Sequence, residues 1–248
     1  MGLREFYRKQ KYRYRILRKV NWSKTLYFNF KKFPFSIASK LPVFIYGKMK
    51  LTNISGEIIL PQKVKTAMIG FGQQFEKMTT SYGIAELNIG GTLAFKGYAH
   101  VGKDCFIYVG EGGYCEMGNM TALGSGVKII CAQKIILGDW NRIGYESQII
   151  DTNSHFMINT KTGQQYPKIE SISMGNYNSV SNRVSIMPGT KTPDYCVIAS
   201  NSLCVKDYAK LGSNILMGGI PAKLIRENFS RDWEFEREHM IRSVVVRF

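Results

Sequence analysis

The amino-acid sequence predicts an all-β solenoid, a parallel β-helix built from six-residue units. After about residue 88, apolar residues recur every six positions. A very small residue often follows each of them, and another small or β-branched residue lies four positions after it. Neither a helical period nor simple strand alternation requires this combination. Six residues make one short strand and one turn, so three units close a triangular coil whose apolar residues stack on the next coil.

Each position of the repeat is filled by side chains of one kind. The apolar position holds Ile89, Phe95, Val101, Ile107, Leu123, Ile129, Ile135, Leu137, Ile143, Ile149, Met174, Val180, Ile186, Ile198 and Cys204. The tiny residue after it is Gly90, Gly102, Gly124, Gly138, Gly144, Gly175, Ser181 or Ala199. We expect these small residues where the chain bends at a corner or where the interior narrows. Cys105, Cys196 and Cys204 are expected to be stacked core residues.

The repeat loses its phase at several points, and the longest break separates Ile149 from Met174. It encloses a loop at residues 150–173. Because loops of this length in a compact protein are commonly functional, we expect this loop to carry function. Residues 50–88 show weaker periodicity and are expected to form irregular first coils.

The chain divides into three expected parts: a basic aromatic N-terminal arm at 1–50, the β-helix domain at 51–226, and a helix with a tail at 227–248. The C-terminal helix is expected to begin near Ser230, since the acidic Asp232 then falls in its first turn. We expect it to cap the open end of the solenoid, where strand edges would otherwise stay unpaired.

Positive charge is concentrated at the N-terminus. The chain of 248 residues has a formal net charge of +16, and residues 1–50 hold 14 Lys and Arg against Glu5 alone. Aromatic residues interleave with these cations, a pattern that suits an anionic membrane face or a polyanionic substrate. The alternative is a solvated arm that packs its aromatics on the main domain. No zinc-finger, RNP or helix-turn-helix pattern accompanies the charge, so nucleic acid is not an expected partner.

Several other classes are disfavoured by missing patterns. No stretch approaches the roughly 18 apolar residues of a spanning helix, and no signal-peptide core occurs, so we expect a cytoplasmic protein with contact at the inner membrane face through residues 1–50. The five cysteines form no C-x-x-C pair, which argues against a disulfide framework or a cysteine zinc site. Neither glycine-rich phosphate-loop pattern occurs, which disfavours nucleoside triphosphate or dinucleotide chemistry.

Three stretches near the end of the repeat carry a resemblance: Met174–Gly189, Val197–Asp207 and Gly218–Arg226, the last with a Pro-Ala-Lys sequence. Over residues 85–226 the chain resembles the hexapeptide-repeat acyltransferases, with the repeat, a histidine-bearing loop and the Pro-Ala-Lys tail in order. More narrowly, it is similar to the O-acetyltransferases of bacterial capsule and lipopolysaccharide gene clusters. The resemblance implies left-handed coils, a homotrimer with active sites between subunits, and acetyl-CoA as the acyl donor.

The resemblance also implies coenzyme contacts, at Asn182, Ser200, Lys206, Lys223 and Arg226. Backbone groups on the corner turns would hold the pantetheine arm, and the cations would meet the phosphates. Three places depart from the family pattern: its Trp-Ile-Gly is Ser179-Val180-Ser181, its Gly-Ala-Gly is Ala199-Ser200-Asn201, and its asparagine before the tail proline is Ile220.

His155 lies near the start of the long loop, where the family keeps its catalytic histidine. An imidazole can accept a hydroxyl proton near neutral pH. We expect His155 to deprotonate a sugar hydroxyl that attacks the thioester, with backbone N–H groups stabilising the oxyanion, and then to protonate the departing thiolate. Asp151 or a loop carbonyl is expected to fix the imidazole tautomer. His100, in a coil turn, is expected to be structural, and His239 to face solvent.

The expected function is acetyl transfer from acetyl-CoA to a sugar hydroxyl of a bacterial surface polysaccharide or its precursor. One alternative is N-acylation of an amino sugar, including a nucleotide-linked one, on the same scaffold. A second is a non-catalytic scaffold that binds glycan or membrane through its basic arm. A zinc hydratase of the β-helix type needs three imidazoles around the metal. The chain has three histidines in all, and one of them, His239, falls in the expected terminal helix, so no metal is expected.

Overall fold

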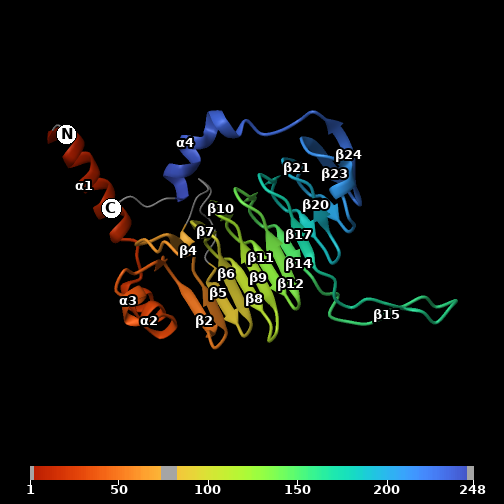
Figure 1. Ribbon diagram of the computed structural model, residues 1–248, viewed down its shortest axis with the longest axis horizontal. Coiled ribbons are helices and arrows are strands. Elements are labelled where there is room, and N and C mark those ends of the chain that lie inside the picture. Colours follow the sequence, from red (N-terminus) through yellow and green to blue (C-terminus); the bar gives the residue numbers. More distant parts are fainter. Residues whose placement is uncertain (1–2, 74–82, 245–248) are drawn as a thin grey trace.

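The computed structural model describes residues 3–73 and 83–244 and forms a three-sided solenoid (Figure 1). Sheet 1 contains β1 (Val43–Ile45), β4 (Ile69–Gln73), β7 (Ala99–Gly102), β10 (Thr121–Leu123), β13 (Arg142–Ile143), β18 (Ser179–Val180), β21 (Cys196–Ile198), β23 (Ile215–Gly219) and β24 (Ala222–Glu227). Sheet 2 contains β2 (Met49–Asn53), β5 (Ala85–Ile89), β8 (Phe106–Val109), β11 (Lys128–Cys131), β14 (Gln148–Ile150), β19 (Ser185–Ile186) and β22 (Leu203–Cys204). Sheet 3 contains β3 (Glu57–Ile59), β6 (Thr92–Phe95), β9 (Tyr114–Met117), β12 (Lys134–Leu137), β17 (Ile172–Met174) and β20 (Lys191–Thr192).

Apart from β24, the strands of the three sheets pair in parallel with the equivalent strand one coil further along, and the apolar repeat positions stack in register. In sheet 1 the buried ladder runs through Val101, Leu123, Ile143, Val180 and Ile198. In sheet 2 it runs through Ile107, Ile129, Ile149, Ile186 and Cys204. The five cysteines are buried, and Cys105, Cys196 and Cys204 belong to the core cluster. The predicted coil stacking is confirmed.

The tiny residues of the repeat are required by the close approach of successive corners. A Cβ atom on Gly144 would lie 2.5 Å from the carbonyl carbon of Ser181 on the next coil. The left-handed conformation that bends the chain falls elsewhere in the corner, on residues such as Glu146 and Arg183, each with φ of 58°. Of the two expected causes, the narrow space between coils therefore accounts for Gly144.

The N-terminal segment differs from the expected arm. It folds into α1 (Leu3–Leu17), α2 (Trp22–Lys32) and α3 (Phe35–Ala38), and the solenoid already begins at β1, before residue 51. Phe28 on α2 is fully buried, with its ring centroid 6.3 Å from that of Phe71. Asn29 donates from Nδ2 to the carbonyl of Val43 at 2.7 Å, which ties α2 to β1. The helix α2 therefore covers the first coil, and α1 projects from the body (Figure 1).

The C-terminal helix α4 (Trp233–Val244) lies along the outer side of sheet 1, not over the open end of the solenoid as expected. Its Trp233 and Met240 pack with Met120 and Trp140 of the corners that lead into sheet 1. Asp232 is the N-cap, since its Oδ1 accepts from the N–H of Phe235 at 2.9 Å, so the helix begins later than Ser230. At the C-terminal end, β24 pairs antiparallel with β23 and covers its edge. A short 3-10 turn, Ala209–Leu211, precedes β23.

Candidate active site

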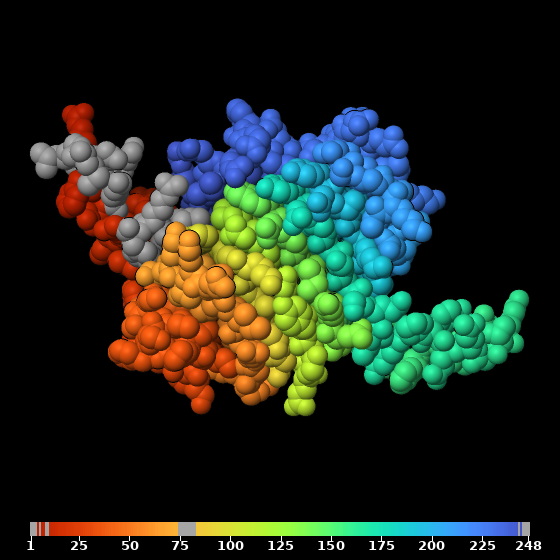
Figure 2. Space-filling model, viewed as in Figure 1, coloured from red at the N-terminus to blue at the C-terminus, as the bar shows by residue number. Residues whose placement is uncertain are grey.

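The predicted functional loop is a hydrogen-bonded hairpin that projects from the corner between sheets 2 and 3 (Figures 1 and 2). Its strands β15 (Met157–Ile158) and β16 (Gln165–Tyr166) pair antiparallel, and Thr152 bridges to Ile169 at its base. The N–H of Asn153 donates to the carbonyl of Lys168 at 2.9 Å. This ladder gives the projecting segment a defined backbone conformation.

His155 lies exposed near the base of the hairpin, directly after Ser154, whose φ is +60°. The hairpin beside it presents large apolar side chains to solvent: Phe156 (65% exposed), Met157 (50%), Ile158 (54%) and Tyr166 (50%). Lys168 places its Nζ 5.2 Å from the centroid of the Phe156 ring. The imidazole therefore stands on a surface that is both apolar and accessible.

Asp151 is fully buried and does not orient His155 within this protomer. Its Oδ1 accepts from the N–H of Ala132 at 2.7 Å, and its Oδ2 accepts from those of Gln133 and Lys134 at 2.8 and 2.9 Å. These donors belong to the turn after β11 and to the first residue of β12. The carboxylate thus fastens the hairpin base to the coil below, and the expected contact with the imidazole is replaced by three backbone hydrogen bonds.

The carboxylate of Asp151 also borders the thiol of Cys131. Burial, with the nearby carboxylate as a second cause, raises the pKa of this thiol to about 12. Burial likewise raises the pKa values of Cys196 and Cys204 to about 12. Thiolates are the reactive form of cysteine, so these three residues are inert packing groups near neutral pH.

Three of the five expected coenzyme residues follow the corner between sheets 1 and 2. Ser200 donates from Oγ to Oδ1 of Asn182 on the preceding coil at 2.7 Å. On the next level, the N–H of Gly219 donates to Oγ of Ser202 at 3.1 Å, and Lys223 pairs with the neighbouring Gly218. Asn182, Ser200 and Lys223 therefore occupy successive levels of one edge of the prism.

The other two expected coenzyme residues lie apart from that edge. Lys206 is exposed after β22, at the corner between sheets 2 and 3, with its Nζ 5.6 Å from the Tyr208 ring centroid. Arg226 is exposed on β24, where it pairs with Leu216, and stacks 5.7 Å from the centroid of Phe229. One protomer does not gather all five residues at a single place.

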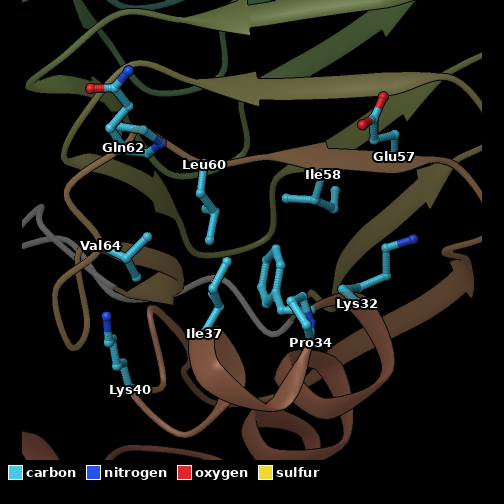
Figure 3. Close-up of a pocket in the computed structure, with 11 residues that line it drawn as sticks. Lys32, Pro34, Ile37, Lys40, Glu57, Ile58, Leu60, Gln62 and Val64 are labelled. Atoms are coloured by element: carbon cyan, nitrogen blue, oxygen red, sulfur yellow. The ribbon is translucent and has the colours of Figure 1, made fainter.

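A cavity of about 450 Å³ lies between α2–α3 and the first coil (Figure 3). Apolar side chains such as Ile37 and Leu60 line it, and Lys32 and Lys40 stand at its sides. Lys32 donates from Nζ to the carbonyl of Ile54 at 2.9 Å, which fixes this cation to the coil. The cavity contains none of the sequence-predicted site residues.

A second cavity, of about 340 Å³, lies between α4 and the outer face of sheet 1. It is lined by Arg142, Arg231 and His239, among others, and neither arginine is predicted as a site residue from the sequence. The repeat places Arg142 on the outside of the coil, but no sequence signal shows that α4 covers it. His239 is exposed on α4, as expected, whereas His100 lies on strand β7 and not in a coil turn, and it is buried.

Comparison with known proteins supports the fold. No family model matches the sequence, and no curated protein matches it. The solved structure of the polySia-specific acetyltransferase NeuO matches with a TM-score of 0.53 and 16% identity, covering 77% of this chain and 84% of that chain. The chain thus shares the left-handed parallel β-helix fold with that acetyltransferase.

Two further solved structures are similar at lower scores. The polysialic acid O-acetyltransferase OatWY matches with a TM-score of 0.39 and 16% identity, covering 75% of this chain and 91% of that chain. The hexapeptide-repeat acetyltransferase VCA0836 from Vibrio cholerae O1 biovar eltor, complexed with acetyl coenzyme A, matches with a TM-score of 0.40 and 20% identity, covering 50% and 64%.

Proposed function

We propose that the chain is an acetyl-CoA-dependent O-acetyltransferase that acts on a sugar hydroxyl of a bacterial surface polysaccharide or its precursor. The observation that carries this proposal is an exposed imidazole, His155, on a hairpin that projects from one corner of the β-helix. The similarity to the structure of a polySia-specific acetyltransferase supports the same class of reaction and acceptor.

In the proposed reaction His155 acts as general base and then as general acid. It accepts the proton of the sugar hydroxyl while that oxygen bonds to the acetyl carbonyl carbon. As the carbon–sulfur bond breaks, His155 returns the proton to the departing sulfur. The products are the O-acetyl sugar and free coenzyme A, so atoms and charge balance without a further reactant.

The coenzyme is proposed to lie along the edge marked by Asn182, Ser200 and Lys223. The amide and hydroxyl of the first two offer polar groups to the pantetheine arm, and the ammonium offers a point charge to phosphate. Lys206 and Arg226 are proposed as further phosphate ligands. Both are exposed cations, which suits a ligand that enters from solvent.

The active site is proposed to be completed in a homotrimer, because His155 and the Asn182–Ser200 edge lie at different corners of one prism. A hairpin of one protomer would reach the edge of its neighbour. Exposed apolar side chains on the hairpin, such as Phe156 and Ile158, support this arrangement, since burying them against another copy is favourable.

The proposal is tested with purified protein, acetyl-CoA, and a panel of hydroxyl and amino sugars. We expect release of coenzyme A together with an O-acetyl sugar, detected by mass spectrometry, in the fraction that elutes at the mass of three 28.2 kDa chains. Products acetylated on nitrogen alone would establish the amino-sugar alternative. Full activity in a monomeric fraction would contradict an active site completed in a trimer. Absence of coenzyme A release with every acceptor would favour the non-catalytic scaffold.

The helix α1 is proposed to hold the protein at the inner face of the membrane, from the cytoplasm. It projects from the body and exposes cations together with aromatic side chains such as Tyr7 (69% exposed) and Tyr14 (65%). Ile16 packs into a small cluster with Val20 and Phe44, which anchors the end of α1 to the coil. Among the described residues, no helix combines the length and apolar character needed to cross a bilayer.

Vesicle co-sedimentation tests this contact. We expect binding to vesicles that contain phosphatidylserine and none to pure phosphatidylcholine, with binding weakened by salt. A variant with glutamine at three exposed cations should bind roughly a hundredfold less tightly, because each cation near the surface contributes about 1 kcal/mol. Those cations are Lys11, Arg15 and Arg18.

The matched control changes Lys128, Lys161 and Lys210, exposed lysines outside the arm. Equal loss in both variants would contradict a specific role of α1.

A further inference from the structure

The floor of the cavity between α4 and sheet 1 is formed by both apolar and polar residues, and charged side chains stand at its rim. Three residues of its floor form one outward-facing row, since Ala122 pairs with Arg142 and Arg142 pairs with Ser179. Arg231 and His239 approach from the C-terminal segment above this row. Because the neighbours of Arg142 in the row are small, its long side chain has open space beside it.

Arg142 is partly buried, and its hydrogen-bonding capacity is only partly used. Its Nη1 donates to the carbonyl of Met120, and its guanidinium carbon lies 5.9 Å from the Trp140 ring centroid. Its Nη2 is buried and has no hydrogen-bond partner in the described part of the chain. A buried charged donor without a partner is costly, so this nitrogen is poised to receive an acceptor.

Arg231 brings a second guanidinium to the same cavity. Its Nη2 pairs with the carboxylate of Glu236, and its guanidinium carbon lies 5.1 Å from the Trp233 ring centroid. Burial lowers the pKa of Arg142 to about 10, and repulsion from Arg231 is the second cause. The carboxylate of Glu236 acts to raise the pKa of Arg142, but this carboxylate is already paired with Arg231. Two guanidinium groups therefore meet at a cavity beside one carboxylate.

We propose that this cavity binds an oxyanion, a carboxylate or phosphate group, between Arg142 and Arg231. Guanidinium groups offer paired N–H donors that match the oxygens of either anion. A volume of about 340 Å³ holds a group the size of an acidic or phosphorylated monosaccharide, within the range of small-molecule sites. The site lies on the outer face of sheet 1, and its binding of an anion does not depend on the proposed acetyl transfer.

Isothermal titration with inorganic phosphate, glucuronate and neutral glucose tests the proposal at constant ionic strength. We expect the protein to bind at least one of the two anions and not glucose. Binding of glucuronate alone would identify an acidic sugar as the ligand class, and binding of phosphate alone would identify a phosphorylated one. Absence of binding by both anions would overturn the proposal.

Variants locate the binding. Arg231→Gln changes a partly exposed side chain, and we expect it to raise the dissociation constant of the bound anion roughly tenfold or more. Arg142→Met should do the same, with circular dichroism confirming that each variant is folded. Arg242→Gln is the matched control, because Arg242 lies on α4 and is 70% exposed. Unchanged affinity in folded Arg231→Gln, or equal loss in Arg242→Gln, would overturn the assignment.

Discussion

We expect the His155→Ala substitution to lower the rate of acetyl transfer by a factor of about 10² to 10⁴, with little change in the midpoint of thermal unfolding. The loss follows from removing the group that accepts the hydroxyl proton and returns it to the sulfur. Stability should be preserved because His155 is exposed on the projecting hairpin. Coenzyme A release with a competent acceptor measures the rate, and calorimetry measures the unfolding midpoint.

A control variant separates a catalytic role from damage to the hairpin. Lys161→Ala changes an exposed residue near the hairpin tip and should retain activity close to that of the unmodified protein. Undiminished transfer by His155→Ala would exclude His155 from the mechanism.

The sequence predicted the coils well because their determinant is local and repeated. Residues such as Ile129 and Ile149 recur at a spacing that only coil stacking explains, and the structure pairs them directly. The position of α4 could not be predicted in this way. Its contacts involve residues distant in the chain, such as Trp233 with Tyr177, whose rings lie 5.4 Å apart. A helical sequence pattern does not specify which surface the helix will cover.

The N-terminal segment shows the same difference between local pattern and tertiary contact. Interleaved aromatics and cations predicted an arm, and this description suits only α1. Phe28 belongs to the same aromatic series in sequence, yet it is buried over the first coil, whereas Tyr27 beside it is 55% exposed. Because burial is decided by which face of α2 meets the coil, composition alone could not separate these two residues.

The histidine loop was located from sequence because a long break interrupts an otherwise regular repeat. The role expected for Asp151 was a weaker inference, since proximity along the chain does not determine where a side chain points. The backbone N–H groups of residues 132–134 each need a hydrogen-bond acceptor, and the buried carboxylate of Asp151 accepts from all three. The sequence carries no direct signal of that need.

Replacing Asp151 should have the largest effect on stability of the substitutions considered. We expect Asp151→Ala to lower the free energy of unfolding by about 3–5 kcal/mol, because three backbone N–H groups lose their hydrogen bonds to one buried carboxylate. Asp151→Asn should recover part of this loss, since one amide oxygen can accept from Gln133 and Lys134 while its NH₂ group faces the N–H of Ala132. Urea denaturation measures both changes.

Asp194→Asn is the matched control for the same chemical change at an exposed corner. Oδ1 of Asp194 accepts from the N–H of Asn176 at 2.7 Å, and Oδ2 accepts from Nδ2 of Asn176 at 3.5 Å. An asparagine keeps the shorter bond and loses only the longer, exposed one. At an equivalent corner, Oδ1 of Asn176 already accepts from the N–H of Asp139. We therefore expect this control to change the free energy of unfolding by less than about 1 kcal/mol.

The stability and activity of Asp151→Asn together decide between two roles for this carboxylate. If Asp151 fastens the hairpin, the variant loses stability, and acetyl transfer falls because the base of the segment that carries His155 is loosened. If Asp151 instead orients the imidazole in the assembled enzyme, transfer falls while the free energy of unfolding stays at its original value. Three short hydrogen bonds to the turn after β11 and to the first residue of β12 favour the first outcome, and unchanged stability with lost activity would contradict it.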